Sequence, residues 1–265
     1  MFDRILVVLD ELNDREAVLP HLRRFAGACA THLILMKTVP FVDSLMEMPH
    51  DLSPEVEADD EEIYVSALAE ALTAEGIDAE GFTNLGQSGL SIAAAAERVD
   101  ASLIVAVASQ PRLRIGPLLA ATRIPVCLVP SRGSAPLGRI LILFDGTPAS
   151  LEVLPTATAL AQRFSSGIVF LRTVTSPSQV GLAEVRNLLS REGVPSQFVV
   201  PAGAPAAEIV RLVHDSGAPV LIVRQSIPSA VEMPVSIPSR GPLLSGLGRR
   251  RVGANPLDGV GVPWD

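Results

Sequence analysis

The sequence contains little cysteine and no long apolar run, and each shortage excludes a class of protein. Among 265 residues there are two cysteines, Cys29 and Cys127, with no Cys-x-x-Cys spacing, so we expect buried reduced thiols rather than a disulfide or a metal site. No apolar run reaches the roughly 18 to 20 residues of a membrane span, and a strand pattern begins at once instead of a signal peptide. We therefore expect a soluble, cytoplasmic protein without a membrane partner.

Basic residues are missing from one long segment. Between Lys37 and Arg98 there is no lysine or arginine, while fourteen acidic residues lie there. The net charge is −8, so the rest of the chain is close to +6. Arginine outnumbers lysine twenty to one, a bias that codon composition explains more simply than phosphate binding. The run Arg249–Arg251 is too short, on an acidic protein, to indicate a nucleic-acid partner.

The main positive feature is an internal duplication. The run Arg4-Ile-Leu-Val-Val-Leu-Asp10 returns as Arg139-Ile-Leu-Ile-Leu-Phe-Asp145, and at this offset ten of 36 positions are identical. Each copy predicts a strand buried on both faces of a parallel sheet, an acidic turn, a helix and a second buried strand. The duplication therefore predicts two α/β units.

The helices of the two copies share their apolar spacing. In the first helix of each copy, successive apolar residues are four, three and four positions apart. This spacing places them on one face of the helix, and we expect that face to pack against the sheet. The positions are Val18, Leu22, Phe25 and Cys29 in the first copy, and Val153, Ala157, Leu160 and Phe164 in the second. The second helices are predicted to end near Ala74 and Arg191, each followed by a glycine suited to a left-handed C-cap.

These repeats predict two domains. The first spans residues 1–133 and carries an acidic insert at 41–58, which we interpret as a solvated loop or, alternatively, a partner surface. A linker at 134–138 leads to the second domain, 139–241, in which the stretch from Ser226 to Pro234 is too short for a fourth helix. Residues 242–265 follow no period and are expected to form a flexible or partner-bound tail.

The motifs of both copies resemble the universal stress protein family. The match in the second copy reads Asp145-Gly146-Thr147 after the first strand, and Val200-x-x-Gly203-x-Pro205 with Ile209 before a later strand. The copies together cover about 220 residues. The resemblance implies α/β architecture with two tandem doubly wound five-stranded parallel sheets, each with strand order 3-2-1-4-5 and helices on both faces.

The resemblance also implies a ligand crevice in each half, between strands 1 and 4, where the winding direction reverses. Members that bind nucleotides place adenine near the aspartate after strand 1 and the end of strand 2, and hold phosphates with a glycine loop after strand 4. The corresponding crevice residues are Asp10, Val39 and Ser109 in the first copy, and Asp145, Gly146, Thr147, Val174 and Ser226 in the second.

This sequence departs from that glycine loop in both copies. The stretch 109–117 has one glycine and two prolines, and 226–234 is shorter still. Proline has no N–H to donate. Losing three charge-assisted hydrogen bonds, at roughly 1.5 to 3 kcal/mol each, would turn a micromolar site of about −8 kcal/mol into one near or beyond millimolar, about −4 kcal/mol. We therefore expect no tight ATP binding, although ATP remains the possible cofactor.

Several of the candidate residues also have a possible structural role. Asp10 and Asp145 also suit helix capping at a strand-to-helix junction. Arg112 and Arg114 would either grip an anion or lie in a solvated loop. The pair Gly86-x-x-Gly89 suits turn chemistry. The four histidines show no metal-ligand spacing and no nucleophile partner, so we expect them at surface or hydrogen-bonded positions: His21, His32, His50 and His214.

Two functions from different classes follow. The first is a non-catalytic regulatory or binding protein of the universal stress type, whose halves pair across their fifth strands and which binds a protein partner or a second copy through such edges. The second is an ATP- or AMP-binding switch or slow nucleotidase that uses Asp10 or Asp145. An adenylating enzyme is disfavoured because the chain lacks a phosphate loop and any acid, base and nucleophile set.

Overall fold

We analysed a computed structural model of the chain. It describes residues 2–9, 14–29, 31–39, 54–86, 89–107, 115–129, 139–144, 151–172, 182–199 and 220–222.

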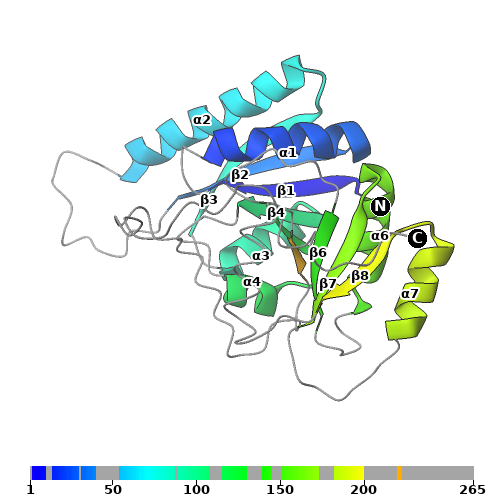
Figure 1. Cartoon of the computed structure of the whole chain (residues 1–265). Coiled ribbons are helices and arrows are strands. Elements are labelled where there is room, and N and C mark those ends of the chain that lie inside the picture. The colour runs from blue at the N-terminus through cyan, green and yellow to red at the C-terminus, as the bar shows by residue number, and fades with distance from the viewer. Residues whose placement is uncertain are drawn as a thin grey trace, which may run out of the picture.

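Five parallel strands form the sheet of the first half (Figure 1). Their order is β3-β2-β1-β4-β5, and each neighbouring pair is parallel. The predicted order 3-2-1-4-5 is therefore confirmed. The strands are β1 (Arg4–Leu9), β2 (His32–Val39), β3 (Ala79–Leu85), β4 (Leu103–Val107) and β5 (Val126–Val129).

Helices cover both faces of this sheet. Helices α1 (Asp14–Cys29) and α2 (Pro54–Ala74) pack on the face that carries Ile5 and Leu33. Helices α3 (Gly89–Arg98) and α4 (Ile115–Ala121) pack on the opposite face, against Leu6 and Ile34. Alternate residues of β1 and β2 thus enter two separate cores, as expected for strands buried on both sides.

The second half repeats this pattern with four described strands. They are β6 (Arg139–Phe144), β7 (Gly167–Arg172), β8 (Ser196–Val199) and β9 (Val220–Ile222). Their order is β9-β6-β7-β8, all parallel, which corresponds to strands 4-1-2-3 of the repeat. Helices α6 (Leu154–Phe164) and α7 (Leu182–Arg191) pack on the same face of the sheet as α1 and α2.

The two halves form one nine-stranded sheet, because β5 pairs with β9 in antiparallel register, Cys127 opposite Leu221. By the repeat, β9 is the fourth strand of the second copy. Strand β5 is the fifth strand of the first half, and it also lies next to β9, where the second half's own fifth strand was expected. The predicted pairing of two fifth strands is wrong in this respect: the open edge of β5 has paired with the fourth strand, since an unpaired edge binds any complementary strand edge.

Several predicted segments lie outside the described residues. These are the second copy's fifth strand within 234–241, the linker 134–138 and the tail 242–265. The domain boundaries therefore stay predictions.

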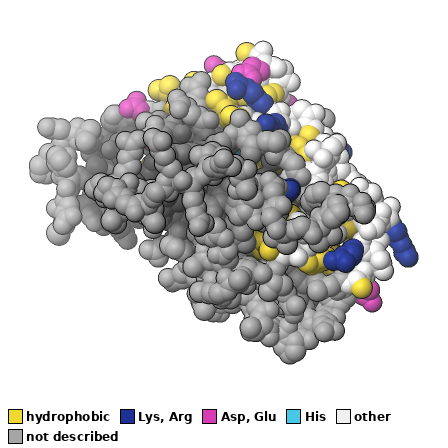
Figure 2. Space-filling model, viewed as in Figure 1, with side chains coloured by type: hydrophobic (Ala, Val, Ile, Leu, Met, Phe, Trp, Pro, Cys, Tyr) yellow, Lys and Arg dark blue, Asp and Glu magenta, His cyan; other side chains and the backbone are white. Residues whose placement is uncertain are grey.

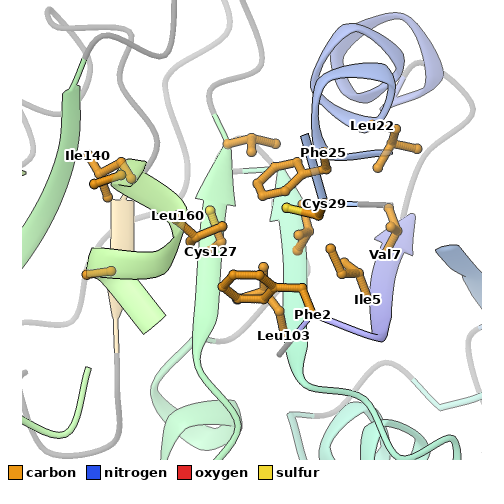
Figure 3. Close-up of a cluster of buried hydrophobic side chains, with 14 of the residues drawn as sticks. Phe2, Ile5, Val7, Leu22, Phe25, Cys29, Leu103, Cys127, Ile140 and Leu160 are labelled. Atoms are coloured by element: carbon orange, nitrogen blue, oxygen red, sulfur yellow. The ribbon is translucent and has the colours of Figure 1, made fainter. Parts of the chain in front are cut away.

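Helices α1 and α6 join the halves through side chains. The rings of Phe25 and Phe164 meet edge to face, with centroids 5.2 Å apart and planes at 89°. Arg163 Nη1 donates to the carbonyl of Ala28 at 3.0 Å, near the end of α1. Figure 3 shows the shared core, with Phe25 and Cys29 from the first half and Ile140 and Leu160 from the second. The halves thus share one apolar core on this face.

The predicted helix faces and helix ends are confirmed. Leu22, Phe25 and Cys29 are buried in α1, as are Val153, Ala157 and Leu160 at the equivalent positions of the second half. Helix α2 ends at Ala74 and α7 at Arg191. The glycines that follow, Gly76 and Gly193, have φ of 84° and 70°, as a left-handed C-cap requires.

The last five residues of the acidic insert, 54–58, are helical, which corrects the loop interpretation for those residues. Helix α2 begins at Pro54, so residues 54–58 form its first turns, while 41–53 lie outside the described residues. Proline suits the first position of a helix, and the acidic Glu55 and Glu57 suit its positive amino end. At the other end of α2, acidic and basic side chains lie next to each other (Figure 2), and Arg23 pairs there with Glu75.

The helices in the described part of the chain are all too short or too polar to cross a bilayer.

Both thiols are free and buried, as predicted. Burial raises the pKa of Cys127 to about 12 and also raises the pKa of Cys29, where the charge of Arg163 partly opposes the effect. Because the thiolate is the reactive form, we expect native protein to react slowly with iodoacetamide at neutral pH and unfolded protein to take up two equivalents. Mass spectrometry after timed alkylation measures this. Rapid native labelling of Cys127 would contradict the burial.

Candidate functional site

The candidate site of the first half lies at the carboxyl ends of β1 and β4. Strand β1 pairs with β2 on one side and β4 on the other, with Val8 opposite Ala106. The winding direction therefore reverses between β1 and β4, as predicted, so the predicted ligand crevice belongs at the carboxyl ends of these strands, after Leu9 and Val107. In the second half, β6 holds the same place between β7 and β9.

One of the eight predicted crevice residues, Val39, lies within the described ranges. The others fall outside them: Asp10, Ser109, Asp145, Gly146, Thr147, Val174 and Ser226. Asp10 and Asp145 directly follow the last residues of β1 and β6, so their chain positions agree with the crevice, but their side chains stay predictions.

Val39 is the last residue of β2, and a hydrogen bond holds its backbone. Its side chain is buried, and its carbonyl accepts the N–H of Gly86 at 2.8 Å. Gly86 has φ of 93°, and its own carbonyl accepts the hydroxyl of Ser91 at 2.8 Å. This turn therefore joins the end of β2 to the start of α3, and the turn interpretation of Gly86 is confirmed.

Gly89 allows α3 and α4 to touch. A Cβ added at Gly89 would lie 2.2 Å from the backbone nitrogen of Leu118 and 2.6 Å from the carbonyl carbon of Pro117. Such distances leave no room for any side chain. The amino end of α3 is thus packed against the backbone of α4, which gives the second glycine of Gly86-x-x-Gly89 a packing role.

The segment between β4 and α4 is short and contains no glycine. Strand β4 ends at Val107 and α4 begins at Ile115, which leaves Ala108-Ser-Gln-Pro-Arg-Leu-Arg114 between them. Gly116 already belongs to α4. A phosphate cradle in this position needs several backbone N–H groups free to approach the ligand, and glycine permits that approach. The element boundaries therefore agree with the loss of a glycine loop.

The strand directions place the predicted crevices of the two halves at opposite edges of the sheet. Strands are parallel within each half, whereas β5 and β9 are antiparallel. The carboxyl ends of β1 and β4 therefore lie at one edge, and those of β6 and β9 at the other. The two predicted crevices therefore do not share one edge of the sheet.

A buried ion pair lies near the first crevice. Lys37, the chain's single lysine, has a side chain that is 4% exposed, and its Nζ is 3.5 Å from Oε1 of Glu61 on α2. Lys37 stands beside Leu9 in the β1–β2 register, two residues before Val39. A charge buried to this degree needs a partner, so the pair ties α2 to β2. Sequence analysis did not identify Lys37, although one lysine in an apolar strand was the available signal.

A cavity of about 450 Å³ lies away from the crevice, at the amino ends of β1 and β4. It is lined by Asp3, Arg4 and residues 100–102. Two of its polar side chains have partners: Arg4 Nη1 donates to the carbonyl of Val99 at 3.1 Å, and Ser102 Oγ donates to the carbonyl of Arg4 at 2.8 Å. This cavity does not coincide with any predicted site residue.

The described residues contain no group of three metal-ligating side chains. Of the four histidines, His32 is paired with two carboxylates, as expected for a satisfied position. His21 is buried, while His50 and His214 lie outside the described ranges.

Residues 1–121 match the model of the universal stress protein family. The match covers a little under half of the chain's 265 residues, so the first half is similar to universal stress proteins in sequence. The match covers β1 to α4, which includes four of the five strands in the order 3-2-1-4-5 and ends before β5. No match to a curated protein is found.

Solved structures with the same fold cover more of the chain than the family match. A universal stress protein from Archaeoglobus fulgidus is 14% identical, with a TM-score of 0.64 over 84% of this chain and 97% of its own. A putative universal stress protein from Pseudomonas aeruginosa UCBPP-PA14 is 16% identical, with a TM-score of 0.50 over 84% of this chain and 93% of its own. A functionally unknown protein from Pseudomonas aeruginosa PAO1 is 16% identical, with a TM-score of 0.51 over 84% and 92%. At these identities the likeness concerns the fold.

Proposed function

We propose that this protein is a non-catalytic regulatory or binding protein of the universal stress type that does not bind ATP tightly. The observation that carries the proposal is the glycine-free connection of seven residues between β4 and α4. Its position is where the fold would present backbone N–H groups to phosphates. Pro111 lies within it and has no N–H.

Within the described residues, which begin again at Gly89, the neighbouring helix α3 does not replace the missing donors. The amino end of α3 lies at the same sheet edge, but Gly89 there is in contact with the backbone of α4. Each missing charge-assisted hydrogen bond costs roughly 1.5 to 3 kcal/mol, so three of them separate a micromolar site from a millimolar one. This comparison favours a role that does not depend on bound triphosphate.

The action then proceeds through a protein partner or a second copy, in the cytoplasm. Both edges of β5 are paired within the chain, with β4 and β9. A homodimer through fifth-strand edges would therefore have to use the second copy's segment within 234–241. That assembly stays part of the proposal.

Isothermal calorimetry with ATP, ADP and AMP in Mg²⁺ tests the proposal. We expect no saturable heat below about 1 mM ligand for the full-length protein, because the phosphates lack backbone donors. The matched variants are Asp10→Ala and Asp145→Ala, each of which removes one crevice carboxylate. Titration of these variants with ATP, ADP and AMP should also give no saturable heat.

A saturable micromolar response that Asp145→Ala or Asp10→Ala abolishes would overturn the proposal and identify the protein as a nucleotide-binding switch. Release of inorganic phosphate from ATP, lost in the same variant, would identify a slow nucleotidase.

A further inference from the structure

His32 is held between two carboxylates at the amino end of the β2–β3 pair. Its Nδ1 lies 2.9 Å from Oδ2 of Asp78, and its Nε2 lies 3.1 Å from Oε1 of Glu80. The parallel register places Leu33 opposite Ala79, so His32 stands beside Asp78 at the first step of the pairing. The N–H of Leu33 donates to the carbonyl of Asp78 at 2.9 Å, which continues the pairing through the backbone.

This geometry suits the charged imidazolium. Both ring nitrogens face acceptor-only carboxylates, and only the doubly protonated ring donates from both. Burial by itself lowers the pKa of His32, but the hydrogen bonds and charges of Glu80 and Asp78 outweigh it, and the pKa is raised above its ordinary value. The ring is partly buried, at 26% exposure, while Asp78 and Glu80 are largely exposed.

Two arginines near this end of the sheet have partners elsewhere. From β1, Arg4 stands opposite His32 in the register and donates to the carbonyl of Val99. From α3, the guanidinium of Arg98 lies 5.4 Å from the ring centroid of Phe82 on β3. Asp3 supplies its carbonyl to the N–H of His32 at 3.1 Å. Asp78 and Glu80 are therefore the carboxylates that hold the imidazole.

A second ion pair holds the same turn from the other side. The turn between α2 and β3 runs from Glu75 to Asp78, and Arg23 of α1 makes two hydrogen bonds to Glu75, each 2.7 Å long. Arginine does not titrate near neutral pH, whereas histidine does. The Glu75 end of the turn is thus held by a pair that does not titrate near neutral pH. The Asp78 end is held by His32, which does.

We propose that His32, Asp78 and Glu80 form a pH-sensitive latch, which fixes the amino end of β3 to β2 while the imidazole of His32 is charged and releases it when the ring becomes neutral. Among the described strands β3 is the first of the sheet, with β2 as its one neighbour. Loosening its amino end therefore changes an edge, the part of a sheet that strands of other chains can pair with.

The raised pKa of His32 determines in which direction of pH the latch opens. A histidine whose pKa is higher in the folded state stabilises that state fully below the unfolded pKa of about 6.5. The stabilisation is lost as the pH rises through the folded pKa, because a neutral ring donates from one nitrogen and leaves one carboxylate without its partner. The latch therefore opens on the alkaline side of pH 6.5.

Hydrogen exchange of the β3 amides, followed by NMR on the full chain between about pH 5.5 and pH 8.5, tests the latch. After correction for intrinsic exchange rates, we expect the protection of residues 79–81 to fall about twofold to fivefold as the pH rises, the size of a partly exposed ion pair. In His32→Gln protection should not depend on pH. Asp78→Asn and Glu80→Gln, at exposed positions, should each lower the pKa of His32 measured from its imidazole resonances.

Arg23→Gln is the matched control. It removes the neighbouring ion pair and should lower protection equally at both pH values, leaving the pH dependence of the wild type. The latch is refuted if His32→Gln keeps the wild-type pH dependence, or if the imidazole of His32 titrates at or below the value of a free histidine.

Discussion

Replacing Phe25 by alanine is expected to lower the free energy of unfolding by about 3 to 5 kcal/mol, the usual cost of removing a buried aromatic ring. The side chain of Phe25 is 1% exposed and lies in the core that both halves share. Its ring also meets Phe164 of α6 edge to face, so the change removes a contact between the halves as well as buried area. Urea denaturation followed by circular dichroism measures the loss.

The contact between the halves can be separated from simple burial by a double-mutant cycle with Phe164→Ala. A direct aromatic pair predicts a coupling energy of about 0.5 to 1.5 kcal/mol. Leu188→Ala is the control, because Leu188 on α7 is 47% exposed and its loss should change stability by less than about 0.5 kcal/mol. Additive effects of the Phe25 and Phe164 changes would show that α1 and α6 do not pack as described.

Replacing Gly89 by alanine is expected to cost about 3 kcal/mol, at the upper end for inserting one methyl group into a packed interior. The added Cβ would lie 2.2 Å from the backbone nitrogen of Leu118, and a backbone atom cannot move aside by rotating a side chain. Helices α3 and α4 would therefore have to separate. The thermal unfolding midpoint, measured by calorimetry, should fall by several degrees.

Gly27→Ala is the matched control for this change. Gly27 lies in α1, and a Cβ there would meet nothing within 4 Å. Alanine is the better helix former, so this variant should gain about 0.5 to 1 kcal/mol. If Gly89→Ala were as stable as Gly27→Ala, the close contact between α3 and α4 would be wrong.

Repeated local patterns in the sequence predicted most elements of the fold. The apolar steps through Leu22, Phe25 and Cys29 depend on helix geometry alone, and the ends at Ala74 and Arg191 depend on the glycines that follow. The position of the crevice followed from the strand order. The helix features are local and the strand order follows from the family resemblance, so a single sequence was sufficient to predict them.

Contacts between distant segments were not predicted. The pairing of β5 with β9 depends on which strand edge is open after each half has folded, and periodicity does not contain this information. His32 and Asp78 are 46 residues apart, and only the register of β2 and β3 brings them together. The pair of Lys37 and Glu61 depends in the same way on how α2 packs on the sheet. The start of α2 at Pro54 was missed because the acidic segment has no apolar face to reveal a helix there.

We propose that the crevices of this protein lack the backbone donors that a nucleoside triphosphate requires. Native mass spectrometry of the full chain, purified quickly from the soluble extract and then mixed with Mg²⁺ and about 0.1 mM ATP, tests it most directly. We expect the mass of the unliganded chain, 27.9 kDa per copy, before and after ATP is added. A stoichiometric adenine nucleotide that is retained through purification, or taken up from the added ATP, would contradict it.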